Sequence, residues 1–315
     1  MTQQTDILND KNFKPVLNKG FVGIVDIMGD DNAIAQAARV SYAKGTKAVS
    51  TNRGLIRYLM RNWHSTPFEM AEIKLHVKLP LFVARQWMRH RTFSYNEISY
   101  RYSEIEDDFY MPSEEVIMPQ SVDNKQGRAG TLSQKNKLGV KWIFNTIFEH
   151  SMTAYKILLG EKEKSEDWYD VYEDDILDPD YQGVAKELAR CVVSTSIYTE
   201  FYCKGNLKNW LHFIKLRDDP HAQYEIRVYA NAIFNLLKEK FPLAIEAFED
   251  YQKNGYSLSR MDKDVIQDLV QSGLPFDQWY SNLVITHGSD KDIAKHFGST
   301  EREFKELKEK VFNIS

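Results

Sequence analysis

RQWMRHRTFSYNEISYRYSE, residues 85–104, is the most informative segment of this sequence. Its first seventeen positions hold five basic side chains among aromatic and apolar ones: Arg85, Arg89, His90, Arg91 and Arg101. Such a cluster is costly to desolvate unless an anion or a carboxylate pairs with it. Arginine binds phosphate through two parallel hydrogen bonds, and Ser94, Asn96 and Ser99 add neutral hydrogen-bonding groups. A phosphate site and an ion-pair network between subunits both fit the arginines, and the added polar residues favour the ligand.

The residues just before this segment predict a strand followed by a helix. Apolar residues from Ile73 to Leu79 alternate with Lys74, His76 and Lys78, which is the period of a strand with one solvent-exposed face. We expect His76 to be exposed on that face. Pro80 ends the strand and can open a helix, and LFVARQWMRHR (81–91) has a helical pattern. Polar turn-forming residues follow at 92–96.

The N-terminal part predicts another strand and two helices. GFVGIVDIM (20–28) is rich in valine and isoleucine, and Asp31 or Asn32 can cap the helix that follows. Apolar residues between Leu55 and Trp63 recur at helical spacing. That helix is expected to end at HSTP (64–67), since a residue that precedes proline disfavours helix.

The second half of the chain predicts mainly helices. After a surface loop at 107–135, we expect helices at 142–159, 183–194, 206–216 and about 220–240, with a solvated acidic insertion at about 160–182. A few strands among long helices, without repeated βαβ units, indicate an α+β fold with a mixed or antiparallel sheet. We assign one domain to residues 1–255 and a small helical extension of unknown role to 256–315.

The C-terminal extension contains a segment similar to a helix-turn-helix. DIAKHFGSTEREFKELKEK (292–310) has a glycine at the expected turn. A DNA reader should present a basic face, yet residues 288–315 hold six lysines or arginines and six acidic residues. A packing or oligomerisation role is therefore favoured over DNA binding.

Composition excludes several classes of protein. The 315 residues carry a net charge of −4, which argues against a cationic nucleic-acid coat. No apolar run approaches the roughly 18 residues of a membrane helix, and the polar N-terminus is not a signal peptide, so we expect a soluble, cytoplasmic protein. Cys191 and Cys203 are read as small core residues in helices. Neither a metal motif nor a Gly-rich nucleotide fingerprint is present, and no metal is expected.

Four ordered segments give the sequence a specific resemblance. Arg89-His90-Arg91, seven residues and then Ser99 form the R-H-R-x7-S pattern of flavin-dependent thymidylate synthases (ThyX). HSTPFE (64–69), VARQW (83–87) and NLKNWLHFIKLRDDPHAQYEIR (206–227) are similar to the same family, in the same order. The resemblance implies a ThyX-type fold and reductive methylation of dUMP to dTMP. It further implies methylenetetrahydrofolate as carbon donor, NADPH-reduced FAD, and a homotetramer with shared active sites.

The resemblance also implies site residues. For dUMP they are Gln86, Arg89, Glu97, Ile98, Ser99, Tyr100, Arg101, Arg190 and Arg217. For FAD they are Ser41, His64, Thr66, Arg89, His90, Arg91, Glu97, Asn206, His212 and His221. Arg217, beside the uracil ring in the family, is the expected catalytic group because a fixed cation there would stabilise charge on N3 and the ring carbonyls.

Two of these residues need an interpretation of their own. Ser99 is read as a nucleotide ligand, since hydride from the flavin makes a protein nucleophile unnecessary in this family. His90 lies between two arginines, which disfavours its charged form, so we expect a neutral hydrogen-bonding group. Two alternatives stay open: a flavin-dependent dUMP hydroxymethylase on the same scaffold, and a nucleic-acid-binding protein that uses the arginines and the C-terminal extension.

Overall fold

The computed structural model of the chain describes residues 10–41, 51–122, 125–161, 177–178 and 180–312. The chain divides between Phe248 and Glu249 into two compact units. The boundary expected at residue 255 falls between two helical elements of the second unit, η3 (Glu249–Lys253) and α10 (Arg260–Ser272). In the described part of the chain, no helix is long and apolar enough to span a bilayer.

A five-stranded antiparallel sheet organises the first unit. Its order is β1-β2-β3-β5-β4, from β1 (Phe13–Val16), β2 (Gly20–Met28), β3 (Glu72–Pro80), β4 (Ser94–Glu97) and β5 (Tyr198–Asn206). Every neighbouring pair is antiparallel. In this order β3 is the central strand. The α+β prediction is confirmed, and the sheet is antiparallel rather than mixed.

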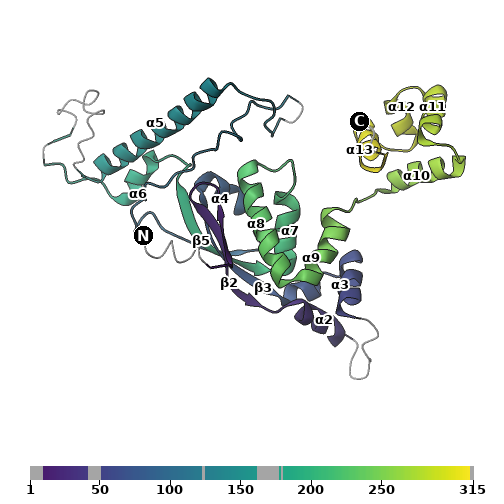
Figure 1. Cartoon of the computed structure of the whole chain (residues 1–315), viewed down its shortest axis with the longest axis horizontal. Helices are drawn as coiled ribbons and strands as arrows, with labels where there is room; N and C mark the ends of the chain where they lie inside the picture. The colour runs from purple at the N-terminus through teal and green to yellow at the C-terminus, as the bar shows by residue number, and fades with distance from the viewer. Residues whose placement is uncertain (1–9, 42–50, 123–124, 162–176, 179, 313–315) are drawn as a thin grey trace. The chain divides into compact units, whose positions relative to one another are not determined.

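The two faces of the sheet differ in character. The alternating apolar residues of β3 are fully buried on the face covered by α4 (Leu81–Trp87), α7 (Leu207–Arg217) and α8 (Tyr224–Lys240) (Figure 1). The other face carries Lys74, His76 and Lys78. His76 was expected to be exposed, but its side chain is only 11% exposed. Its ring stacks on Tyr202 with centroids 4.6 Å apart, and it pairs with Glu200, because neighbouring strands cover it.

A second helical group packs beside these helices in the first unit. It consists of α2 (Asp31–Val40), α3 (Asn52–Arg61), the 3₁₀ turn η1 (Thr66–Met70) and α9 (Pro242–Phe248). The cap of α2 is Asp30, which accepts from the Ala33 amide at 2.8 Å, rather than Asp31 or Asn32. Buried Asp31 instead accepts from the amides of Leu243 and Ala244 at 2.7 and 2.9 Å. It therefore ties the first turn of α9 to α2.

A third group surrounds the long helix α5 (Gln134–Leu158). Phe148, Met152 and Tyr155 of α5 form a core with Ile105, Ala189 and Ile197. Ala189 ends α6 (Lys186–Ala189), and η2 (Arg190–Val192) follows directly. Most of the acidic insertion expected at about 160–182 lies outside the described residues.

Several sequence predictions were wrong about element type or length. Residues 183–194 form only the short α6 and η2 instead of one helix, and β1, β4 and β5 were missed. The helix expected to reach Arg91 ends at Trp87, while α5 begins eight residues early and α8 starts at Tyr224. Cys203 is buried in a strand, and Cys191 is exposed in η2, so neither lies in an apolar helix. β5 pairs with β3 along its whole length, and its tyrosine, threonine and phenylalanine residues favour a strand.

The second unit is a small helical bundle with its own core. Its helices after α10 are α11 (Phe276–His287), α12 (Asp290–His296) and α13 (Glu301–Phe312). Val265, Trp279, Ile293, Ala294, Phe304 and Leu307 are buried together. Gly298, at φ +74°, lies in the turn between α12 and α13, where the sequence predicted a glycine turn.

Candidate functional site

A cluster of aromatic side chains packs beneath the basic residues of segment 85–101. Trp87, fully buried at the end of α4, contacts Phe213 of α7. The ring centroids of Phe93 and Trp210 are 4.3 Å apart. The hydroxyl of Tyr95 donates to the carbonyl of His90 at 3.0 Å and is 3.3 Å from that of Trp87. The chain therefore turns sharply between α4 and β4 on this cluster, with Arg89 and Arg91 exposed and His90 buried.

Arg85, Arg89 and Arg91 are exposed, and within the described part of the chain none has a carboxylate partner. The alternative interpretation, an ion-pair network between subunits, would need carboxylates from another chain. Three uncompensated guanidinium groups within seven positions repel one another and attract an anion.

His90 and Arg217 form the centre of the first group of predicted site residues. The Nε of Arg217, at the end of α7, donates to Nε2 of His90 at 2.9 Å. The rings of His212 and His90 lie edge to face, 6.2 Å apart. Burial, helped by the charges of Arg217 and His212, lowers the pKa of His90 to about 4. His90 is therefore neutral at physiological pH, as predicted, and it fixes the direction of the Arg217 guanidinium.

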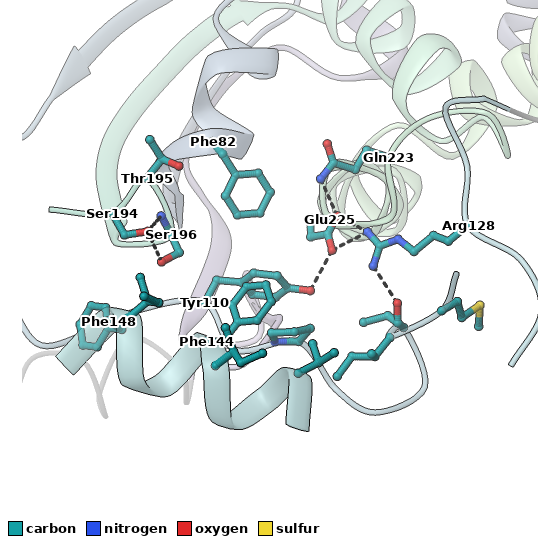
Figure 2. Close-up of a pocket in the computed structure, with 17 residues that line it drawn as sticks. Phe82, Tyr110, Arg128, Phe144, Phe148, Ser194, Thr195, Ser196, Gln223 and Glu225 are labelled. Carbon is teal, nitrogen blue, oxygen red and sulfur yellow. Dashed lines mark hydrogen bonds and ion pairs between the residues drawn. The ribbon is translucent and has the colours of Figure 1, made fainter. Parts of the chain in front are cut away.

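Gln86 connects this group to a buried polar network that sequence reasoning missed. Its amide donates to Gln223. Gln223 in turn donates to Glu225 at 2.8 Å (Figure 2). Glu225, only 2% exposed, also accepts two bonds of 2.7 Å from Arg128 and one of 2.8 Å from the Tyr110 hydroxyl. Burial alone would raise the pKa of Glu225, but Arg128 and Tyr110 outweigh it and hold the pKa below its usual value.

A cavity of about 600 Å³ opens beside this network. Aromatic and aliphatic side chains line one side of it, including Phe82, Phe144 and Phe148, and Glu225 with Arg128 lies at the other (Figure 2). A second hollow of about 510 Å³ includes His221, Gln223 and Arg227. Of the predicted residues only His221 lines either cavity, so the predicted arginines lie outside both.

The second group of predicted residues follows β4. Glu97 accepts from the Thr199 hydroxyl at 2.6 Å, and the amide of Ile98 donates to the Glu200 carbonyl at 2.9 Å. The Tyr100 hydroxyl donates to the Tyr198 carbonyl. No described base contacts the hydroxyl of Ser99, which accepts from the Arg101 amide at 3.4 Å. The Ser99 carbonyl accepts from the amides of Tyr102 and Ser103. Ser99 thus lies in a tight turn without the partner that a nucleophile needs.

Arg101 and Arg190 lie next to each other in this second group. Arg101 pairs with Glu187 of α6 at 2.8 Å, and the Nε of Arg190 donates to the Glu187 carbonyl at 3.3 Å. Among the described contacts, none joins this group to His90 and Arg217. The structure therefore presents the predicted nucleotide residues of one chain as two separate groups.

The remaining residues predicted for the flavin are spread along helix ends. Ser41 ends α2, Thr66 begins η1, and the side chain of Asn206 caps α7 by accepting from Asn209 at 3.0 Å. His64 is exposed, with its ring 5.7 Å from that of Tyr58. His221 pairs with Asp219 at 2.9 Å. These residues are not drawn together by contacts with one another in the described part of the chain.

Neither cysteine has the setting of a nucleophile. Cys203 is fully buried in β5, and burial raises the pKa of its thiol to about 12. Cys191 is exposed, with its sulfur 3.8 Å from the Glu187 carbonyl, and lacks a described basic partner. The described residues also contain no group of three histidine, cysteine or carboxylate side chains placed to bind a metal.

Comparison with known proteins places the chain in a family. The sequence profile described as "Thymidylate synthase complementing protein" matches residues 23–243. Flavin-dependent thymidylate synthase from Rickettsia bellii is 44% identical, with 93% of this chain and 91% of that protein covered. The Gluconobacter oxydans protein of the same name is 48% identical, with 87% of each covered. The crystal structure of the UMP/dUMP methylase PolB from Streptomyces cacaoi, bound with 5-Br UMP, is 30% identical, with a TM-score of 0.63 over 76% of this chain and 98% of that one. The chain belongs to the family of flavin-dependent thymidylate synthases.

Proposed function

We propose that this protein converts dUMP to dTMP by reductive methylation. In this proposal FAD is the flavin, NADPH the reductant, and 5,10-methylenetetrahydrofolate the carbon donor. Family membership supports a flavin-dependent methyltransferase, and the related PolB is named a UMP/dUMP methylase. The observation that carries the proposal is the surface of Arg89 and Arg91, two arginines without carboxylates on either side of His90.

The residues present fit a phosphorylated flavin. The pyrophosphate of FAD needs cationic donors, and Arg89 and Arg91 have their charges uncompensated within the described chain. We assign Arg89, His90, Arg91 and Glu97 to FAD, together with Ser41, His64, Thr66, Asn206, His212 and His221. The bound flavin would supply the hydride that completes the methyl group.

Arg217 is proposed to stabilise the reacting uracil. As C5 becomes nucleophilic, negative charge spreads over N3 and the two ring carbonyls, where a fixed cation lowers its energy. Arg217 is held by neutral His90, which accepts from its Nε and leaves the terminal nitrogens free to face a ligand. Gln86, Arg89, Glu97, Ile98, Ser99, Tyr100, Arg101 and Arg190 are assigned to the nucleotide. Ser99 is a ligand in this scheme, so no covalent enzyme intermediate forms.

Two chains are proposed to complete each site. The nucleotide residues of one chain lie in two groups without a contact between them, which agrees with a homotetramer whose subunits share active sites. One chain would contribute Gln86, Arg89 and Arg217, and its neighbour the turn that follows β4 with Arg190. The enzyme is expected in the cytoplasm.

A visible absorption spectrum is the first test. The purified protein is loaded with FAD, desalted, and titrated with dUMP. Flavin bands that remain and shift with dUMP support one shared site, and dTMP formation with NADPH and methylenetetrahydrofolate completes the proposal. A hydroxymethylated product would contradict the reductive step, and a colourless protein that ignores dUMP would contradict the whole proposal.

A further inference from the structure

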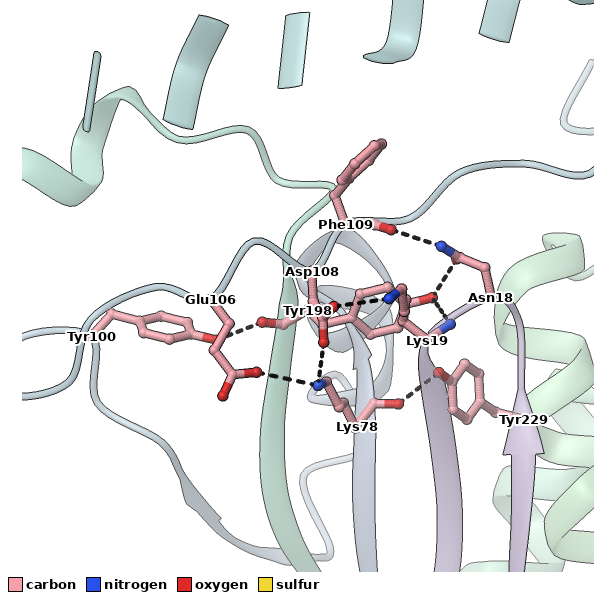
Figure 3. Close-up of polar contacts among 9 residues, drawn as sticks. All are labelled: Asn18, Lys19, Lys78, Tyr100, Glu106, Asp108, Phe109, Tyr198 and Tyr229. Carbon is pink, nitrogen blue, oxygen red and sulfur yellow. Dashed lines mark hydrogen bonds and ion pairs between the residues drawn. The ribbon is translucent and has the colours of Figure 1, made fainter. Parts of the chain in front are cut away.

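Lys78 is a buried cation on the central strand of the sheet. Its side chain is 6% exposed and pairs with Asp108 at 2.6 Å and Glu106 at 3.5 Å (Figure 3). Lys74, four residues earlier on the same face of β3, is 40% exposed and lies 3.8 Å from Asp26. The burial of Lys78 thus comes from the segment that carries Glu106 and Asp108.

That segment begins with the turn that carries the predicted nucleotide ligands Ser99 and Arg101. It leaves the sheet at Ile98, whose amide donates to the Glu200 carbonyl, and returns at Asp108, whose carbonyl accepts from the Tyr198 amide at 3.1 Å. The Tyr100 hydroxyl bonds the Tyr198 carbonyl between these points. Within residues 101–107, Glu106 forms an ion pair with the sheet, at 3.5 Å from Lys78.

Lys78 and Asp108 each have a further contact, with Tyr229 and Lys19 respectively. The Tyr229 hydroxyl, from α8 on the opposite face, donates to the Lys78 carbonyl at 2.7 Å (Figure 3). Asp108 also faces Lys19 at 3.5 Å, on the surface. Burial alone would raise the pKa of Asp108, but the hydrogen bond and charge of Lys78, assisted by Lys19, hold it below its usual value. Asp108 is therefore ionised at neutral pH.

We propose that Lys78 is a positioning residue for nucleotide binding: its pairing with Asp108 and Glu106 docks segment 98–108 on the sheet and fixes Ser99 and Arg101. A buried charge that loses its partner is strongly unfavourable, so the pair favours the docked segment over an undocked one. Lys78 itself faces the segment and does not touch the proposed ligand. This inference rests on the proposed binding of dUMP at Ser99 and Arg101.

The test compares Lys78→Met with Lys74→Met in the flavin-loaded enzyme. Titration of the flavin spectrum with dUMP gives the affinity, and initial rates give KM and kcat separately. We expect Lys78→Met to weaken dUMP binding and raise the KM for dUMP by about tenfold or more. Without the ion pair, part of the binding energy must be used to dock the segment that carries Ser99 and Arg101. Flavin content and kcat at saturating dUMP should stay close to wild type, and Lys74→Met should change nothing.

Asp108→Asn provides a second variant with the same shape and one charge fewer. It should weaken dUMP binding as Lys78→Met does, and the two changes should be non-additive in the double variant. Unchanged dUMP affinity in Lys78→Met would overturn the inference while leaving the proposed function intact. Equal loss of flavin and dUMP in both variants would make the pair a general scaffold element and also overturn it. A wild-type enzyme that ignores dUMP would instead contradict the proposed function.

Discussion

At the scale of single residues, His90 and Arg217 determine each other's state. The Nε of Arg217 can only donate, so Nε2 of His90 must accept, which leaves the proton on Nδ1. Sequence reasoning reached the neutral histidine from the flanking arginines. The cation that faces its ring nitrogen is Arg217, 127 residues away. Spacing along the chain carries no signal for that contact, which only the packing of α4 against α7 creates.

The first prediction concerns Arg217. Replacing it with alanine should remove turnover almost entirely, because charge on the uracil ring loses its fixed cation, a loss of about 100-fold or more for one such donor. FAD should still bind, since the flavin residues remain. Turnover and flavin content are measured side by side. Lys215→Ala, an exposed cation on the same helix, is the control and should be active. Normal turnover in Arg217→Ala would contradict the assigned role.

The second prediction follows from the lowered pKa of His90. Between pH 6.5 and about 4 the unfolded chain binds a proton at His90 that the folded chain does not. The contribution of His90 to the free energy of unfolding should therefore be at its maximum above pH 6.5. It should fall as the pH drops through this window and level off below it. The shift corresponds to at most about 3 kcal/mol. Urea unfolding of wild type and His90→Gln from pH 4 to 7.5 isolates this contribution, and identical slopes would contradict it.

At the scale of elements, residue patterns predicted some strands and missed others. β3 was predicted because its apolar residues alternate from Ile73 to Leu79, and β2 because it is rich in valine and isoleucine. β5 alternates as well, with Thr199, Phe201 and Cys203 buried, but it lies between two expected helices, at 183–194 and 206–216, and was not assigned as a strand. β4 is four residues long and mostly exposed, so only its pairing with β5 defines it.

The polar network at the start of α8 gives the third prediction. Glu225 and Arg128 are 97 residues apart in the sequence, and their pairing anchors the segment before α5 to α8. Arg128→Met leaves a buried carboxylate without its cation and should lower the free energy of unfolding by roughly 3–5 kcal/mol. The exposed pair of Lys208 and Glu69 offers a control, since Lys208→Met should cost about 1 kcal/mol or less. Denaturant unfolding compares both, and equal effects would contradict the argument.

At the scale of the whole molecule, the sheet links the two groups of predicted nucleotide residues. Arg217 ends α7, which begins directly after β5, while Ser99 and Arg101 follow β4 at the edge beside β5. The family resemblance identified these residues from sequence, but not their division into two groups. That division is a matter of topology, because His90, which contacts Arg217, lies just before β4, while Ser99 and Arg101 lie just after it.

The last prediction concerns the second unit, which has its own buried core and lies outside the residues matched by the family profile. A chain that ends at Gly255 should retain flavin, respond to dUMP and turn over at rates close to the full chain, because the site residues and their supports all precede Phe248. In the full chain, Trp279→Ala empties the centre of the second core, where Trp279 is 2% exposed. It should destabilise that unit by roughly 3–5 kcal/mol and leave turnover unchanged. Calorimetry and initial rates measure the two effects. Loss of turnover in either variant would make the second unit part of the catalytic machinery, whereas unchanged rates would leave it a role outside the reaction.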